Sequence, residues 1–114
     1  MIETTDYKSA EYKSVVHTRD LGPGQLTEVQ AHGQAVGLTN VAQTYYAFGA
    51  TCPLDGTNLA RVGLLEGEHL TCPADDATFD VRTGECLDPE GAPGLLLYSV
   101  RVEDNSVKIG PPLD

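Results

Sequence analysis

The sequence predicts an all-β fold, a sandwich or barrel of antiparallel strands. Short β-prone stretches recur along the 114 residues and are separated by clusters of Gly, Pro, Asn and Asp, which is the pattern of hairpin-connected strands. No segment carries apolar residues at helical spacing over three turns. A chain of this length has room for one modest hydrophobic core, so we expect a single domain over residues 1–114.

The first half of the chain contains four stretches with the composition of strands. One of them, residues 25–31, alternates apolar and polar side chains, as a half-buried strand does. The His32-Gly33 pair that follows suits a tight turn, because Gly adopts positive φ readily. Residues 1–11 are polar and acidic, and we expect a loose lead without a function there. The four expected strands are residues 12–18, 25–31, 34–41 and 44–50.

The second half predicts further short strands. A hairpin is expected from residues 59–65 through a turn at Glu66-Gly67-Glu68 into residues 69–71. Two prolines and two glycines make residues 88–94 a loop, and the Pro-rich tail at residues 110–114 is expected to be loose. The remaining expected strands are residues 78–81, 95–103 and 106–109.

Composition excludes several classes of function. Seven Lys and Arg residues and a net charge of −10 disfavour nucleic acid as a partner and favour a basic docking surface on a protein partner. No apolar run reaches the length that crosses a bilayer, and no secretion signal opens the chain, so we expect a cytoplasmic protein. The sequence contains no nucleophilic triad and no phosphate-binding glycine loop, so we expect no catalysis by the chain itself.

Residues 52–80 hold the main candidate site. Two similar phrases lie there, Cys52-Pro53-Leu54-Asp55 and Cys72-Pro73-Ala74-Asp75. Each offers a thiol, a proline that restricts the backbone, and an acid three positions beyond the cysteine. The hairpin expected between them returns the chain on itself, so the two loops are predicted to meet and to form one site.

These loops resemble those of a Rieske-type ferredoxin. The resemblance also includes Phe79-Asp80, Thr83-Gly84-Glu85 and the Pro/Gly loop at residues 91–94, and it covers roughly residues 12–109. It implies a β-sandwich or barrel base with a small site-bearing subdomain at about residues 50–80. It further implies a [2Fe-2S] cluster and transfer of one electron to an oxygenase or a similar enzyme.

The resemblance implies a ligand pattern of Cys-x-His in the first loop and Cys-x-x-His in the second. Cys52 and Cys72 occupy the two thiolate positions, but Leu54 and Asp75 stand where the two histidines are expected. A leucine side chain has no lone pair and cannot bind a metal. The three histidines of the chain lie outside the ligand pattern and are expected to be ordinary strand or surface residues: His17, His32 and His69.

Three states of the site are consistent with this departure. We favour an empty site without a cofactor. The second state is an altered site for a single zinc or iron, with Cys52, Cys72 and Asp75 as candidate ligands. Asp55 is a weaker candidate, because it lies one residue past the expected ligand position and should point elsewhere. The third state is a [2Fe-2S] cluster with foreign ligands.

The state of the cysteines is also open. If the site is empty, Cys52 and Cys72 either form a disulfide or remain buried thiols. Cys86 is expected in the core, on a strand where the resemblance implies an aliphatic residue.

Two functions follow from these readings. The first is a cluster-free accessory subunit that binds or positions a redox enzyme, similar to the small subunit of assimilatory NADH-dependent nitrite reductases. The second is a small electron-transfer ferredoxin with altered Cys/Asp ligation. In both cases the exposed loop tip would face a redox enzyme or reductase, and it carries Leu54, Asp55, Asp75 and Asp76.

Overall fold

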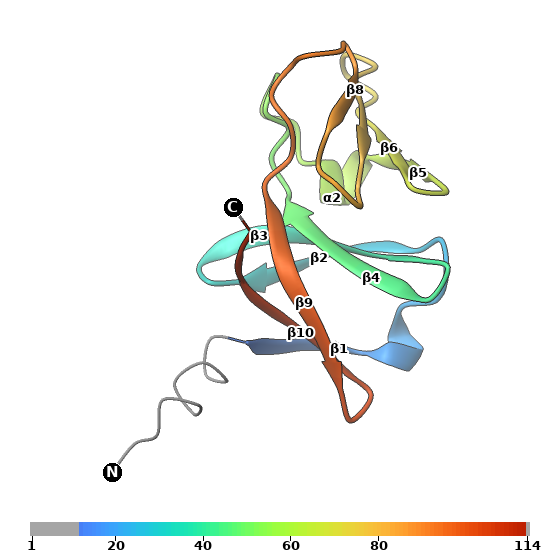
Figure 1. Cartoon of the computed structure of the whole chain (residues 1–114), viewed down its shortest axis with the longest axis vertical. Coiled ribbons are helices and arrows are strands. Elements are labelled where there is room, and N and C mark those ends of the chain that lie inside the picture. Colours follow the sequence, from blue (N-terminus) through green and yellow to red (C-terminus); the bar gives the residue numbers. More distant parts are fainter. Residues whose placement is uncertain (1–11, 114) are drawn as a thin grey trace.

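The computed structural model describes residues 12–113, and two antiparallel sheets make up most of it, which confirms the all-β prediction (Figure 1). The larger sheet has the strand order β1-β10-β9-β4-β3-β2. Its edge strands β1 and β2 approach each other, so the sheet curls towards a closed barrel. Its strands are β1 (Lys13–His17), β2 (Leu26–Ala31), β3 (Gln34–Val41), β4 (Thr44–Gly49), β9 (Leu97–Glu103) and β10 (Ser106–Pro112).

The smaller sheet lies at one end of the larger one, as the upper part of Figure 1 shows. Its strand order is β5-β6-β7-β8, and neighbouring strands are antiparallel. Its strands are β5 (Leu64–Glu66), β6 (His69–Thr71), β7 (Thr78–Asp80) and β8 (Cys86–Asp88). Two short helical turns complete the described residues, the 3-10 helix η1 (Thr18–Asp20) and α2 (Leu59–Val62). Within residues 12–113, no helix is long and apolar enough to span a bilayer.

Two hydrophobic clusters stabilise the fold, one inside the larger sheet and one beneath the smaller sheet. Strand β4 contributes to both, because successive side chains of a strand point to opposite faces. Ala47 belongs to the cluster of the larger sheet, and the fully buried Phe48 belongs to the cluster of the smaller one. Gly37 pairs with Phe48 across the strands, and its missing side chain leaves room for the Phe48 ring.

The connection between the sheets runs through α2. Asn58 caps this turn by accepting hydrogen bonds from the backbone N–H groups of Ala60 (3.0 Å) and Arg61 (3.1 Å). The same Asn58 side chain donates to Glu28 on β2 at 2.8 Å, and Arg61 pairs with Glu28 at 2.8 Å. The smaller sheet is therefore tied to the larger one directly below the first cysteine loop.

Three sequence expectations about secondary structure are wrong. The expected strand at residues 59–65 begins with α2, and only Leu64–Glu66 is extended. The expected loop at residues 88–94 is wrong at its first residue, because β8 extends from Cys86 to Asp88 and pairs with β7. The expected loose tail is wrong for residues 110–112, because β10 extends to Pro112 and Leu113 donates to the Leu97 carbonyl at 2.8 Å. The expected lead at residues 1–11 lies outside the described residues.

Candidate metal centre at the loop tip

The first cysteine loop is closed by three hydrogen bonds. The Cys52 N–H donates to the Thr57 carbonyl at 2.8 Å, and the Gly56 N–H donates back to the Cys52 carbonyl at 2.9 Å. The Asp55 carboxylate accepts from the Thr57 N–H at 2.9 Å, which forms an Asx turn. Gly56 has a φ of +80°, the left-handed conformation that the turn requires.

The second loop repeats this geometry bond for bond. The Cys72 N–H donates to the Ala77 carbonyl at 2.8 Å, and the Asp76 N–H donates to the Cys72 carbonyl at 2.8 Å. The Asp75 carboxylate accepts from the Ala77 N–H at 3.0 Å. Asp76 has a φ of +61° at the position that Gly56 holds in the first loop. The two Cys-Pro-x-Asp phrases therefore adopt one conformation twice.

The two loops place four donor residues together. One potential ligand atom from each of Cys52, Asp55, Cys72 and Asp75 lies within 4.8 Å of the other three. The Cys72 Sγ is 3.6 Å from Oδ2 of Asp55 and 4.0 Å from its Oδ1. The expectation that Asp55 points elsewhere is therefore wrong, because its Asx turn directs the carboxylate back across the loop towards the other cysteine.

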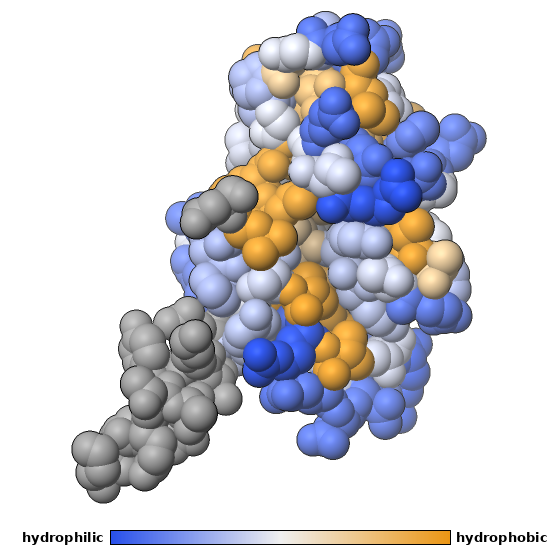
Figure 2. Space-filling model, viewed as in Figure 1, coloured by the Kyte–Doolittle hydropathy of each residue, from blue (hydrophilic) through white to orange (hydrophobic). Residues whose placement is uncertain are grey.

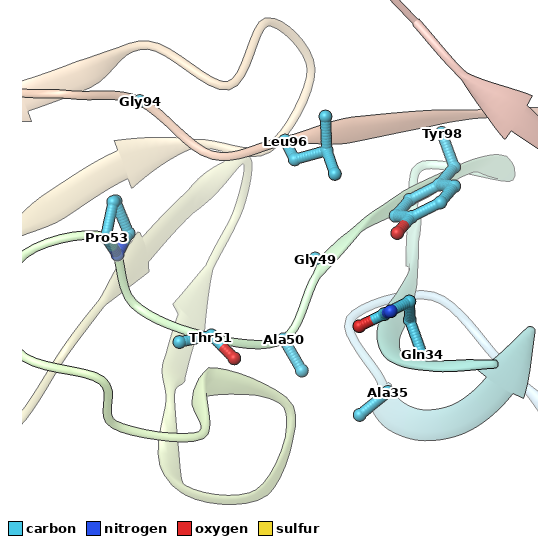
Figure 3. Close-up of a pocket in the computed structure, with 9 residues that line it drawn as sticks. All are labelled: Gln34, Ala35, Gly49, Ala50, Thr51, Pro53, Gly94, Leu96 and Tyr98. Carbon is cyan, nitrogen blue, oxygen red and sulfur yellow. The ribbon is translucent and has the colours of Figure 1, made fainter. Parts of the chain in front are cut away.

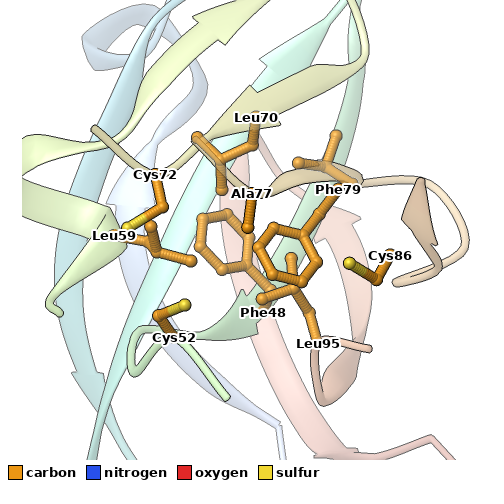
Figure 4. Packing of buried hydrophobic residues seen from close by; sticks show 10 residues of the cluster. Phe48, Cys52, Leu59, Leu70, Cys72, Ala77, Phe79, Cys86 and Leu95 are labelled. Atoms are coloured by element: carbon orange, nitrogen blue, oxygen red, sulfur yellow. The ribbon is translucent and has the colours of Figure 1, made fainter. Parts of the chain in front are cut away.

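The thiols and the carboxylates differ in exposure. Cys52 and Cys72 are buried, whereas Asp55 and Asp75 are exposed at the loop surface. Both thiols belong to the cluster beneath the smaller sheet, together with Leu59, Leu70 and Phe79. In Figure 4 the Cys52 and Cys72 side chains lie on one side of this cluster and Cys86 lies on the other.

All three cysteines are free thiols in this structure. Cys52 and Cys72 are therefore present here as buried thiols and not as a disulfide. Cys86 is buried and its Sγ donates to the Pro89 carbonyl at 3.3 Å, which confirms its expected place in the core. The group near the loop tip therefore contains two of the three cysteine sulfur atoms.

The loops also set the protonation of the donor groups. The backbone N–H of Thr57 is the main reason that the pKa of Asp55 falls to about 2, so this carboxylate is ionised at neutral pH. Burial raises the pKa of the Cys52 thiol, because a thiolate is poorly solvated in the core. An ionised carboxylate at the surface thus faces a protonated thiol below it.

Histidine side chains lie elsewhere in the described part of the chain. Nδ1 of His17 accepts from the Arg19 N–H at 3.1 Å, and Nε2 of His69 lies 3.8 Å from Oε2 of Glu68. His32 stacks on Tyr98, with ring centroids 6.4 Å apart. His17 and His69 thus lie on strands, and His32 lies in the turn between β2 and β3.

Leu54, at the position expected for the first imidazole, is an exposed apolar side chain at the tip, with 38% of its surface accessible. A Rieske cluster takes two thiolates on one iron and two imidazoles on the other. Thiols and carboxylates alone form the four-donor group among the described residues. The residues present therefore do not fit the thiolate–imidazole ligand set.

A separate pocket lies where the two sheets meet (Figure 3). Its volume is about 250 Å³, and small or uncharged residues form its walls, including Gly49, Thr51, Pro53 and Tyr98. No charged side chain lines it within residues 12–113. The pocket thus lacks paired acids or bases for acid–base catalysis.

Comparison with protein families decides the classification. A profile of the family described as "Rieske-like [2Fe-2S] domain" matches residues 11–110. The chain belongs to this family. The match agrees closely with the span over which the sequence resembles a Rieske ferredoxin.

Sequence relatives of this Rieske-like chain fall into two groups. It is 32% identical over 96 residues to apoptosis-inducing factor 3 of Mus musculus, and it spans only 16% of that protein's length. It is 28% identical over 90 residues to the biphenyl dioxygenase ferredoxin subunit of Pseudomonas sp. (strain KKS102), covering 79% of this chain and 83% of the relative. The second group consists of ferredoxin components and not of catalytic subunits, which agrees with the prediction that the chain is not an enzyme by itself.

Solved structures share the fold of this chain. The ferredoxin of carbazole 1,9a-dioxygenase from Nocardioides aromaticivorans IC177 superposes with a TM-score of 0.81 at 24% identity, covering 88% of this chain and 97% of that one. A putative nitrite reductase NADPH (small subunit) protein superposes with a TM-score of 0.74 at 24% identity, covering 86% and 96%. At these identities the comparison establishes the Rieske-like fold.

Proposed function

We propose that this Rieske-like chain is a non-catalytic component of a redox enzyme system. It docks on a larger redox protein through its loop tip and does not hold the two-iron cluster of the family. The observation that carries this proposal is the donor set at the tip, where Leu54 and Asp75 replace the expected imidazoles and no histidine of the described residues belongs to the group.

The relatives support the class of system. Two of these relatives are ferredoxin components of dioxygenase systems, and this chain covers 83% and 96% of their length. One solved complex pairs such a ferredoxin with its oxygenase. By analogy, an oxygenase or a reductase is the class of partner that we propose. This chain spans only 16% of apoptosis-inducing factor 3, so that relative supports only the presence of the domain.

Charge supports the character of the docking surface. The chain carries a net charge of −10, and its tip presents three exposed acids, Asp55, Asp75 and Asp76, around the apolar Leu54. Figure 2 shows hydrophilic residues at the end of the molecule that carries the smaller sheet. An acidic rim around one apolar side chain favours a partner with a basic surface, because complementary charges speed association.

A second candidate is a small electron carrier with altered ligands. The convergence of Cys52, Asp55, Cys72 and Asp75 favours it, because four donors within 4.8 Å of one another are a plausible metal-binding group. This candidate uses the same docking surface, but its tip holds a redox-active iron centre that transfers an electron.

A reconstituted dioxygenase system with separate reductase, ferredoxin and oxygenase components tests the proposal. Our chain in place of the ferredoxin should give no turnover, and in excess over the ferredoxin it should slow the complete system by occupying the docking surface. Turnover when this chain replaces the ferredoxin would instead support the electron carrier. An unchanged rate in the complete system would contradict docking.

Charge variants provide the matched control for docking. Asp76→Asn removes a tip charge, and Asn tolerates the positive φ found there, so inhibition should weaken several-fold. Asp20→Asn removes one charge from the exposed turn η1, which follows β1, and should leave inhibition unchanged. Equal effects of the two variants would mean that net charge alone, and not the tip, governs binding.

A further inference from the structure

Cys52, Asp55, Cys72 and Asp75 form a symmetric group of two thiols and two carboxylates. We propose that this group binds one divalent transition-metal ion, zinc or ferrous iron, in a four-coordinate site. The inference rests on the proposed function in one respect, that the tip does not hold the two-iron cluster. Each loop supplies one sulfur and one oxygen ligand.

The spacing of the donors fits a single ion. Zinc binds sulfur at about 2.3 Å and carboxylate oxygen at about 2.0–2.2 Å, so the sulfur–oxygen edge of a tetrahedral site is about 3.6 Å. The Cys72 Sγ lies 3.6 Å from Oδ2 of Asp55. In a two-iron cluster the two ligand pairs bind different irons, with bridging sulfides between them, so they would lie farther apart.

The loops preorganise the oxygen ligands. In each loop the Oδ1 atom of the aspartate accepts a backbone N–H, from Thr57 for Asp55 and from Ala77 for Asp75. Oδ2 of Asp55 accepts no backbone N–H; it accepts from the Cys72 thiol at 3.6 Å and is the oxygen closer to that sulfur. A metal would therefore meet carboxylates that are already oriented, which lowers the entropic cost of binding.

The charge of the group favours a cation. Two carboxylates lie close together, and within residues 12–113 neither forms an ion pair with Lys or Arg. The cations nearest in sequence are paired elsewhere, Arg61 with Glu28 and Arg82 with Asp80. A bound divalent ion would offset the mutual repulsion of the carboxylates and of the thiolates that bind it.

The chemistry of the donors selects the class of metal. Thiolates are soft ligands that suit zinc and iron, whereas Mg²⁺ and Ca²⁺ take oxygen ligands almost exclusively. Two buried sulfurs in the group therefore disfavour calcium and magnesium. The two exposed carboxylates close the site on the solvent side, as a four-ligand site requires.

Titration of the reduced, full-length protein with Co²⁺ and with Zn²⁺ tests this site. Cobalt is the probe because its visible bands differ between tetrahedral thiolate coordination and hydrated ion. We expect one Co²⁺ per folded chain, with a tetrahedral d–d spectrum and a thiolate charge-transfer band, and stoichiometric displacement by Zn²⁺. Absence of any tetrahedral spectrum up to millimolar Co²⁺ would overturn the proposal.

Matched variants identify the ligands. Asp55→Asn and Asp75→Asn keep the Asx-turn acceptor but lose the anionic oxygen, so each should weaken Co²⁺ binding at least tenfold without unfolding the chain. Asp76→Asn is the neighbouring control and should bind as the unmodified protein does. Cys86→Ser tests the remaining thiol and should leave the spectrum unchanged. Undiminished binding by Asp55→Asn and Asp75→Asn would indicate adventitious binding by thiols and would overturn the proposed ligand set.

The outcomes separate this inference from the proposed function. Two irons with inorganic sulfide in the isolated protein would contradict both. A protein that holds neither cluster nor Co²⁺, and that still inhibits the dioxygenase system, would contradict the single-ion site alone.

Discussion

The carboxylate of Asp55 lies 3.6 Å from the thiol of Cys72, although 17 positions separate the two residues in the sequence. The contact crosses from the first cysteine loop to the second, so the loops form one site and not two. Because one ligand atom of each donor residue lies within 4.8 Å of the other three, a change in one donor is expected to affect the whole group.

Restoring the imidazoles should restore the family's cluster. The double variant Leu54→His with Asp75→His supplies nitrogen donors at both expected ligand positions, beside the intact Cys52 and Cys72. Reconstitution with iron and sulfide should give a red-brown protein with visible absorption and two irons per chain. Leu54→His alone is the control and should remain colourless. A folded double variant that binds no iron would mean that the loops cannot enclose a cluster.

Removing the cap of α2 should weaken the attachment of the smaller sheet. Asn58→Ala loses the cap of this turn and the hydrogen bond to Glu28, and should lower the free energy of unfolding by about 1–2 kcal/mol. Urea denaturation measures the loss. Arg61→Ala removes only an exposed ion pair with Glu28 and should cost much less. Equal losses in the two variants would contradict the capping role.

The approach of Phe48 to Gly37 predicts a sharp steric limit. A Cβ added at Gly37 would overlap the Phe48 ring, which is fully buried and cannot move freely. Gly37→Ala should therefore lower the free energy of unfolding by about 1–3 kcal/mol. Gly22→Ala, where the nearest atom is 3.6 Å from the added Cβ, should be close to neutral. Thermal and urea denaturation measure both losses. Equal losses of stability in Gly37→Ala and Gly22→Ala would contradict the crowding at Gly37.

The Asp80–Arg82 pair predicts a pH dependence of stability. Arg82 donates to Asp80 at 2.9 Å and lowers the pKa of its carboxyl in the folded state. A lowered folded-state pKa means that the pair stabilises the protein above the unfolded-state pKa of about 3.9 and that this contribution disappears as pH falls through the folded-state value.

Asp80→Asn measures that contribution. At pH 7 the variant should be less stable by about 1 kcal/mol, since Asp80 is buried and its partner is half exposed. As pH falls well below the unfolded-state value of about 3.9, the variant and the unmodified protein should become more similar in urea denaturation. A difference that stays constant from pH 7 to pH 2 would show that the charge of Asp80 is not responsible.

Most strands could be predicted from the sequence because their alternation is strong and their turns are explicit. The strand at Gln34–Val41 has the predicted bounds, since His32-Gly33 marks its start. The helical turn α2 was missed because a single turn has no periodicity, and its only local signal is the cap Asn58. Pro111 and Pro112 suggested a loose tail, but they lie past the end of the pairing with β1, where a strand tolerates missing N–H donors.

The site could be predicted only in part. The two Cys-Pro phrases correctly predicted that Cys52, Cys72 and Asp75 meet, because a hairpin between them returns the chain. The place of Asp55 was missed, since counting positions from a family pattern does not describe an Asx turn. The repeat of Cys-x-x-Asp in both loops was the available signal, and with the place of Asp55 it leads to the single-ion site proposed above.

Metal and sulfide analysis of the chain, purified anaerobically at full length, tests the central claim most directly. The claim is that the tip of this Rieske-like fold does not hold a two-iron cluster. We predict no acid-labile sulfide and at most one zinc or iron per chain. Two irons and two sulfides per chain, with the visible absorption of a [2Fe-2S] centre, would contradict it.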